Sequence, residues 1–90
     1  MRTIKVLDHN KFRMFDYENE INPSKYQLGD VLYMNYIYDK QKPEIGVVIQ
    51  TFSDGDIRTD MWGMCSESEV SCATIEQIKL YRPKLIKEIK

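Results

Sequence analysis

The sequence predicts one small all-β domain: a barrel of about five strands with an N-terminal β-hairpin extension and a short C-terminal tail or helix. Ninety residues suffice for a single domain with one modest core. Between Gly29 and Tyr81, short runs rich in β-branched and aromatic residues alternate with turn signals. The pair Asp54-Gly55 lies between two such runs and is a strong hairpin signal, because glycine accepts the positive φ that tight hairpins need.

The first 25 residues are expected to extend the barrel. Thr3 to Leu7 has the pattern of a strand, and Asp8-His9-Asn10 is a turn cluster. Lys11 to Asp16 can return as the second strand of a hairpin. The segment from Asp16 to Gln27 is polar and contains an Asn-Pro-Ser breaker, so we expect a loop there.

The longest β run spans Val31 to Asp39. Alternation places Val31, Tyr33, Asn35 and Ile37 on one face and Leu32, Met34, Tyr36 and Tyr38 on the other. Neither face is polar, so both faces are expected to be covered. A small barrel provides that cover, since one face lines the interior and loops and termini cross the other.

Ile45 to Phe52 and Ile57 to Met61 are the expected arms of the Asp-Gly hairpin. Gly46 in the first arm permits a sharp bend or a close approach of another group to the backbone. Cys65 to Glu69 has turn composition, and Val70 to Ala73 is expected to be the next strand.

The C-terminal part should contain a single 3-10 turn at Thr74 to Gln77, capped by Thr74. A final short strand, Ile78 to Tyr81, would then end at Pro83, which has no donor for a β-ladder. Hydrophobic residues recur at helical spacing in the last segment and indicate a short amphipathic helix; they are Leu85, Ile86 and Ile89.

Four elements together resemble the SH3-like small-barrel superfamily. They are the opening Gly29-Asp30, the Gly46-Val47-Val48 strand, the Asp54-Gly55 hairpin and the turn Ile75-Glu76-Gln77 before a last strand. The resemblance covers about 55 residues, Tyr26 to Tyr81, and implies a barrel (26–81) between an N-terminal extension (1–25) and a basic tail (82–90). The Tyr-rich motif of the peptide-binding subgroup has no residue-by-residue counterpart, so binding of proline-rich peptides is not carried over.

Charge is balanced overall but unevenly distributed. The net charge is −1, which gives no global attraction to nucleic acid or anionic membrane. From Glu44 to Glu76 there are seven acidic residues against Arg58 alone, a net charge of −6, whereas the last twelve residues carry five basic residues against Glu88, a net charge of +4. A solvated acidic face with a basic tail is the simpler interpretation, and attraction between the two regions, within a chain or between chains, is the alternative.

The N-terminus lacks the apolar core of a signal peptide, and no apolar run approaches the ~18 residues of a membrane span, so we expect a cytoplasmic protein. Six residues separate Cys65 from Cys72, which fits neither a CxxC motif nor a zinc pair. That spacing allows the two to face each other across a turn, but non-functional thiols are the favoured interpretation in the cytoplasm.

No catalytic, metal or cofactor site is expected. His9 is the only histidine and lies in a turn cluster. Asp54, Asp56 and Asp60 lack the spacing and the distal glutamate of an EF-hand calcium loop. The candidate nucleophiles have no base at a recognisable spacing; they are Ser66, Ser68 and Cys72. We therefore expect a binding protein and not an enzyme.

Two function classes remain open. The first is a module that binds a protein partner, or a second copy of itself, through a surface of aromatic and charged residues: Tyr36, Tyr38, Trp62, Arg58, Asp54 and Asp56. The aromatic members of that set could equally be core residues. The second is nucleic-acid binding through Lys79, Arg82, Lys84 and Lys87 beside aromatic stacking platforms. The acidic middle of the chain favours the first class.

Small size, absence of a catalytic set and a composition typical of AT-rich genomes also fit a narrower hypothesis. In that hypothesis the chain is a phage or mobile-element accessory protein that acts on a host factor. A housekeeping adaptor fits the same observations equally well.

Overall fold

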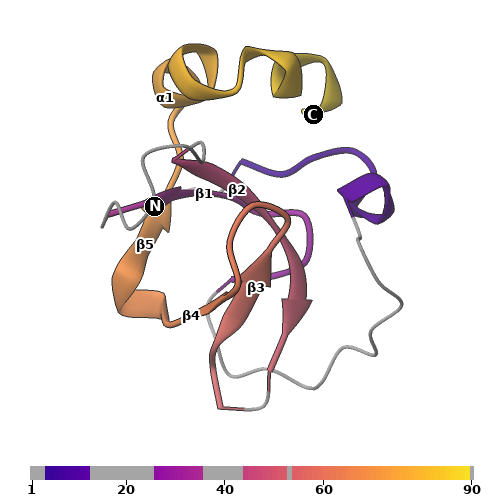
Figure 1. Cartoon of the computed structure of the whole chain (residues 1–90). Helices are drawn as coiled ribbons and strands as arrows, with labels where there is room; N and C mark the ends of the chain where they lie inside the picture. The colour runs from indigo at the N-terminus through magenta and orange to yellow at the C-terminus, as the bar shows by residue number, and fades with distance from the viewer. Residues whose placement is uncertain (1–3, 13–25, 36–43, 53, 90) are drawn as a thin grey trace.

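The structure is a computed structural model that describes residues 4–12, 26–35, 44–52 and 54–89. One antiparallel sheet has the strand order β4-β3-β2-β1-β5 (Figure 1). Its strands are β1 (Val31–Met34), β2 (Ile45–Thr51), β3 (Ile57–Thr59), β4 (Met64–Cys65) and β5 (Val70–Cys72). The helical elements are η1 (His9–Phe12), η2 (Glu67–Glu69), α1 (Ile75–Tyr81) and η3 (Pro83–Glu88). The predicted small, mostly β domain is confirmed, with one short α-helix added.

Strand β2 lies at the centre of the sheet, and all seven of its residues are buried. Its first half pairs with β1, with Val47 opposite Val31, and its second half pairs with β3, with Val48 opposite Thr59. The register shifts between Val48 and Gln50, which inserts one extra residue as a bulge. Because a bulge bends the strand and increases its twist, β2 can serve two partner strands that lie in different planes.

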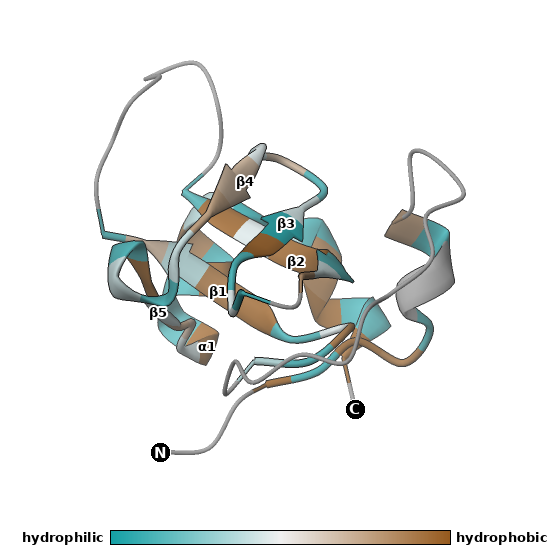
Figure 2. Ribbon diagram, turned by 90° about the horizontal axis from the view of Figure 1, so that it is seen from below, coloured by the Kyte–Doolittle hydropathy of each residue, from teal (hydrophilic) through white to brown (hydrophobic). Residues whose placement is uncertain are grey.

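Each face of the sheet carries its own hydrophobic core. The inner core, on the face of Leu32, consists of Tyr26, Leu32, Met34, Val48, Ile57, Cys65 and Val70. The outer core, on the face of Val31, consists of Val6, Val31, Ile45, Val47, Ala73, Ile78 and Leu85. Figure 2 shows the apolar residues concentrated in β1 and β2. The prediction that both faces of the first long β run are covered is therefore confirmed for Val31–Met34, and residues 36–39 of that run lie outside the described residues.

The two ends of the chain cover the outer core together. The Val31 amide donates to the Ile4 carbonyl at 2.8 Å, so the N-terminal segment runs along the start of β1. Val6 forms an isolated antiparallel bridge with Ile89, and the Leu7 amide donates to the Glu88 carbonyl at 2.6 Å. The expected N-terminal hairpin is wrong where it can be compared, because residues 9–12 form the 3-10 helix η1. The remainder of that hairpin, residues 13–16, lies outside the described residues.

In the C-terminal part, the predicted cap at Thr74 is present, but the residues after it fold differently from the prediction. Thr74 does cap a helix: its hydroxyl accepts from the Gln77 amide at 3.1 Å, and the Gln77 side chain accepts from the Thr74 amide at 2.9 Å. This capping box starts the α-helix α1, so the predicted single 3-10 turn and the strand from Ile78 to Tyr81 are wrong. Helical geometry buries Ile78 completely in the outer core.

Pro83 begins η3 and does not terminate a strand, which suits a residue with a preset φ and no amide hydrogen. The predicted tail helix is thus a 3-10 helix, with Leu85 buried and Ile86 exposed. Among the described residues α1 is the one α-helix, and its seven residues are too few to cross a bilayer.

The glycine turns lie where the sequence indicates them. Gly29 has φ 87° and Gly55 has φ 96°, conformations that favour glycine. In the β2–β3 hairpin the Asp54 carboxylate accepts from the Asp56 amide at 3.0 Å, which is side-chain turn chemistry. The 3-10 turn before the last strand is η2, one loop earlier than the sequence analysis placed it.

Candidate functional site

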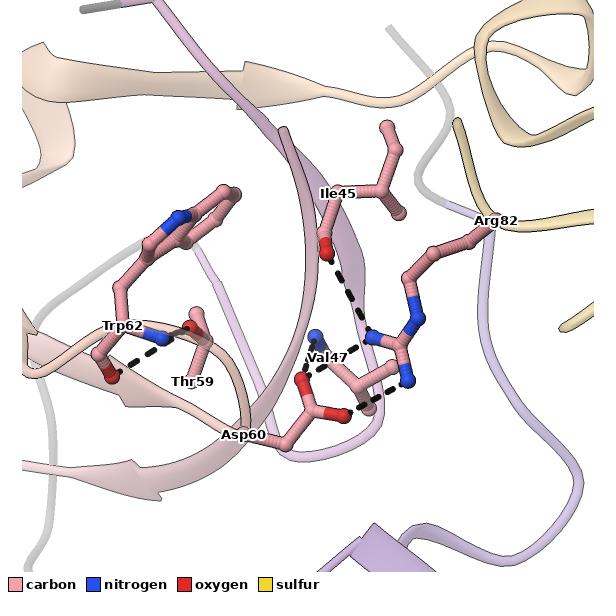
Figure 3. Close-up of polar contacts among 6 residues, drawn as sticks. All are labelled: Ile45, Val47, Thr59, Asp60, Trp62 and Arg82. Carbon is pink, nitrogen blue, oxygen red and sulfur yellow. Dashed lines mark hydrogen bonds and ion pairs between the residues drawn. The ribbon is translucent and has the colours of Figure 1, made fainter. Parts of the chain in front are cut away.

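The predicted aromatic patch is only partly within the described residues. Tyr36 and Tyr38 lie outside them. Trp62 is half-buried in the turn after β3, where its amide donates to the Thr59 hydroxyl at 2.9 Å (Figure 3). Its ring lies on the backbone of β2: a Cβ at Gly46 would stand 2.8 Å from Trp62 Cζ3. Gly46 therefore permits the close approach that the sequence predicts, and much of the Trp62 ring serves packing.

The charged members of that predicted surface lie at the β2–β3 hairpin, far from the helical tail in Figure 1. Asp54 is exposed, whereas Asp56 and Arg58 are half-buried. Glu67 joins them, since a Cβ at Gly55 would lie 3.5 Å from its Oε1. In the part of the chain that the structure describes, no cluster of three or more acidic, histidine or cysteine side chains could hold a metal ion.

Arg82 ties the tail to the sheet. Its Nη2 lies 2.9 Å from Asp60 Oδ2 and its Nη1 lies 3.2 Å from Asp60 Oδ1, a two-point pair (Figure 3). Asp60 Oδ1 also accepts from the Val47 amide at 2.8 Å, and Arg82 Nη1 donates to the Ile45 carbonyl at 3.4 Å. The guanidinium carbon lies 5.9 Å from the centre of the Phe12 ring. Arg82, one of the four cations predicted to meet phosphates, is thus neutralised inside the chain.

A groove of about 420 Å³ opens beside the Asp60–Arg82 ion pair, between η1 and the junction of α1 with η3. It is lined by Lys11, Phe12, Tyr81, Arg82, Pro83, Lys84, Leu85 and Glu88. Four of these residues contribute aromatic or aliphatic surface. Leu85 belongs to the outer core, Phe12 packs against that core, and Tyr81 is 39% exposed. The groove is therefore an opening onto the outer core of the domain.

Tyr81 connects the groove to strand β1. Its ring centroid lies 6.1 Å from that of Tyr33 on β1, with the planes tilted by 44°. A hydrogen bond from the Tyr33 hydroxyl to the Glu44 carboxylate, together with burial, raises the pKa of Tyr33 to about 12. The contact between the two rings supports the exposed ring of Tyr81.

The cations around the groove fall into two groups. Lys11 pairs with Glu88 at 3.2 Å, and Arg82 pairs with Asp60. Lys84 lines the groove and makes no ion pair with any described residue. Lys79 and Lys87 are likewise exposed on the tail without such a pair. The structure thus brings the predicted basic residues to one side of the molecule but leaves only the lysines available.

No family model, curated protein or solved structure matches the chain. Geometry and charge are therefore the grounds on which a function can be argued.

The Cys65 thiol is held in its protonated form. Burial, and next the nearby carboxylates of Glu69 and Asp56, raise the pKa of the Cys65 thiol to about 11. A catalytic cysteine needs the opposite shift, because the thiolate is the reactive species. Cys65 is a member of the inner core.

The sequence analysis missed Lys11, Phe12, Tyr81 and Glu88 as site residues. Phe12 and Lys11 were assigned to a strand, and Tyr81 to the end of another. Tyr81 did have a local signal. It directly precedes Arg82-Pro83 in a basic segment, and an aromatic residue in that place is typical of the exposed end of a helix or strand. The contact across more than 70 residues between Lys11 and Glu88 has no such local signal.

Proposed function

We propose that the chain is a non-catalytic binding module of the SH3-like small-barrel kind that engages a protein partner through the groove between η1 and the tail. One observation carries the proposal: the groove opens onto the outer core, and four aromatic or aliphatic residues share its lining with four charged ones. Apolar clefts with a few polar groups at their rim are the usual shape of a ligand site.

The barrel assignment is supported by the arrangement of the strands. A meander of four strands is completed by β5, which returns to pair with β1, so that Leu32 lies opposite Cys72. A 3-10 turn, η2, directly precedes β5, whereas the resemblance placed this turn at Ile75-Glu76-Gln77, which lies in α1. The bulge in β2 supplies the bend that a small barrel requires.

A protein partner fits the groove better than a nucleic acid does. Two of its three lining cations, Lys11 and Arg82, are already paired with carboxylates of the chain. Nucleic-acid binding depends on several neutralised phosphates and on exposed stacking faces. The second candidate function keeps one observation in its favour, the three exposed lysines Lys79, Lys84 and Lys87 near Tyr81.

The surface predicted from the sequence around Trp62, Arg58, Asp54 and Asp56 stays a prediction. Its hairpin part, residues 54–58, lies far from the helical tail (Figure 1), so that part can be tested separately from the groove. Trp62 packs on Gly46, next to Ile45, whose carbonyl accepts from Arg82.

Site-specific photo-crosslinking tests the proposal. A benzophenone amino acid replaces Tyr81 in one variant and Met64 in a second, since Met64 is an exposed apolar residue on β4, away from the groove. In lysate of the source cells, we expect discrete protein adducts from position 81 and none from position 64. Adducts from position 81 that disappear on nuclease treatment would favour the nucleic-acid function, and identical adducts from both positions would contradict the proposal.

A further inference from the structure

We infer that the occupant of the groove is an acidic peptide segment of the partner that carries at least one large apolar side chain. This inference rests on the proposed function and adds the chemistry of the partner. The apolar side chain enters between Phe12, Tyr81 and Leu85, and acidic residues beside it meet the lysines of η3, which make no ion pair with any described residue.

The size and lining of the groove argue for a side chain as anchor. A volume of about 420 Å³ lies within the range of ligand pockets and exceeds what one aromatic ring fills. An anchor residue and part of its flanking backbone can therefore be accommodated. Phe12 and Tyr81 offer flat faces for an aromatic or aliphatic group, and Pro83 adds a rigid apolar edge.

The charge at the rim argues for acidic neighbours of that anchor. Lys84 and Lys87 are separated by three positions in η3, and in a 3-10 helix residues at this separation lie on the same side. Both are exposed, and within the described ranges neither has an acidic partner. Lys84 lines the groove and Lys87 lies one turn farther along η3, so together they offer a short cationic row that complements an acidic segment.

The paired cations explain why this recognition would be selective. Lys11 and Arg82 hold the walls of the groove through Glu88 and Asp60. A polyanion would have to compete with both carboxylates, whereas an acidic peptide with an apolar anchor needs only the lysine row. The apolar contact then supplies the affinity and the lysines supply orientation.

Selection from random peptides displayed on phage, with the complete chain as bait, tests this inference. We expect an enriched consensus that combines acidic residues with an aromatic or large aliphatic residue. A labelled peptide of that consensus should bind about tenfold or more weakly to Tyr81→Ser than to the original chain, because anchors dominate interface energetics. Leu80→Ser is the matched control: Leu80 is 71% exposed on the same helix and does not line the groove.

Lys84→Glu should weaken binding of the same peptide about fivefold. Lys79→Glu should weaken binding less, because it changes the net charge equally but Lys79 does not line the groove. Equal losses would overturn the role of Lys84. A neutral or basic consensus that depends on Tyr81 would overturn the acidic chemistry and leave the proposed function intact. Enrichment that ignores Tyr81, or tight binding of a single-stranded oligonucleotide instead of any peptide, would overturn both.

Discussion

Asp60 and Arg82 form a two-point ion pair with Nη2–Oδ2 and Nη1–Oδ1 distances of 2.9 and 3.2 Å. Their side chains are 9% and 20% exposed, so the pair is partly withdrawn from water. Asp60 follows β3 and Arg82 ends α1, and the pair thereby fixes the helical tail against the sheet. The attraction between the acidic middle and the basic tail, which the sequence analysis gave as the alternative interpretation, is present at this pair within one chain.

Removing either partner should destabilise the protein. We expect Arg82→Ala to lower the free energy of unfolding by about 2 kcal/mol, because it leaves a nearly buried carboxylate without its cation. Asp60→Ala should cost about 3 kcal/mol, since the Val47 amide then also loses its acceptor. Urea denaturation of both single variants and the double variant measures the coupling. Independent, additive effects would show that the pair contributes little.

Gly46 offers a test of packing with an internal control. Gly46→Ala places a methyl group 2.8 Å from both Thr59 Oγ1 and Trp62 Cζ3, so we expect a loss of about 2 kcal/mol. Gly63→Ala has nothing within 4 Å of the new methyl group and should be nearly neutral. Thermal denaturation distinguishes the two. Equal melting temperatures for both variants would show that Trp62 does not lie on the β2 backbone.

The pKa of Cys65 predicts a loss of stability at alkaline pH. The thiol has a reference pKa of 9.0, and the fold raises it to about 11. The folded state therefore holds the proton more tightly, and the resulting stabilisation is present below pH 9 and is lost as pH rises from 9 to 11. In a Cys72→Ser background, alkylation of Cys65 should remain slow until that range. Rapid alkylation near pH 8 would contradict the buried thiol, and Cys65→Ala should flatten this part of the stability profile.

We expect the packing of the N-terminal segment against the sheet to depend strongly on the carboxylate of Asp30. Asp30 is 1% exposed, accepts from the Gln27 amide at 2.8 Å and pairs with the ammonium group of Lys5. Asp30→Ala should cost about 3 kcal/mol, whereas Lys5→Met should cost about 1 kcal/mol because the Gln27 amide still supports the carboxylate. Hydrogen exchange at Val6 and Val31 should rise in Asp30→Ala. Unchanged exchange there would contradict the account.

The sheet was predictable because its signals are local. Glycine at positive φ marks two turns, and the mixed faces of the run from Val31 indicated cover on both sides. The tail was not predictable in the same way. Ile78 to Tyr81 satisfies a strand pattern as well as a helix, and only the capping box of Thr74 with Gln77 decides in favour of the helix. The groove forms where η1, α1 and η3 come together in space, and a local sequence pattern does not predict such a tertiary contact.

Backbone chemical-shift mapping with the selected acidic peptide tests the central claim most directly. The account predicts that the peptide perturbs Lys11, Phe12 and the segment from Tyr81 to Glu88, while the hairpin at Asp54 to Arg58 remains unchanged. Perturbation centred on Trp62 and that hairpin, with the tail unaffected, would contradict the account and favour the surface first predicted from the sequence.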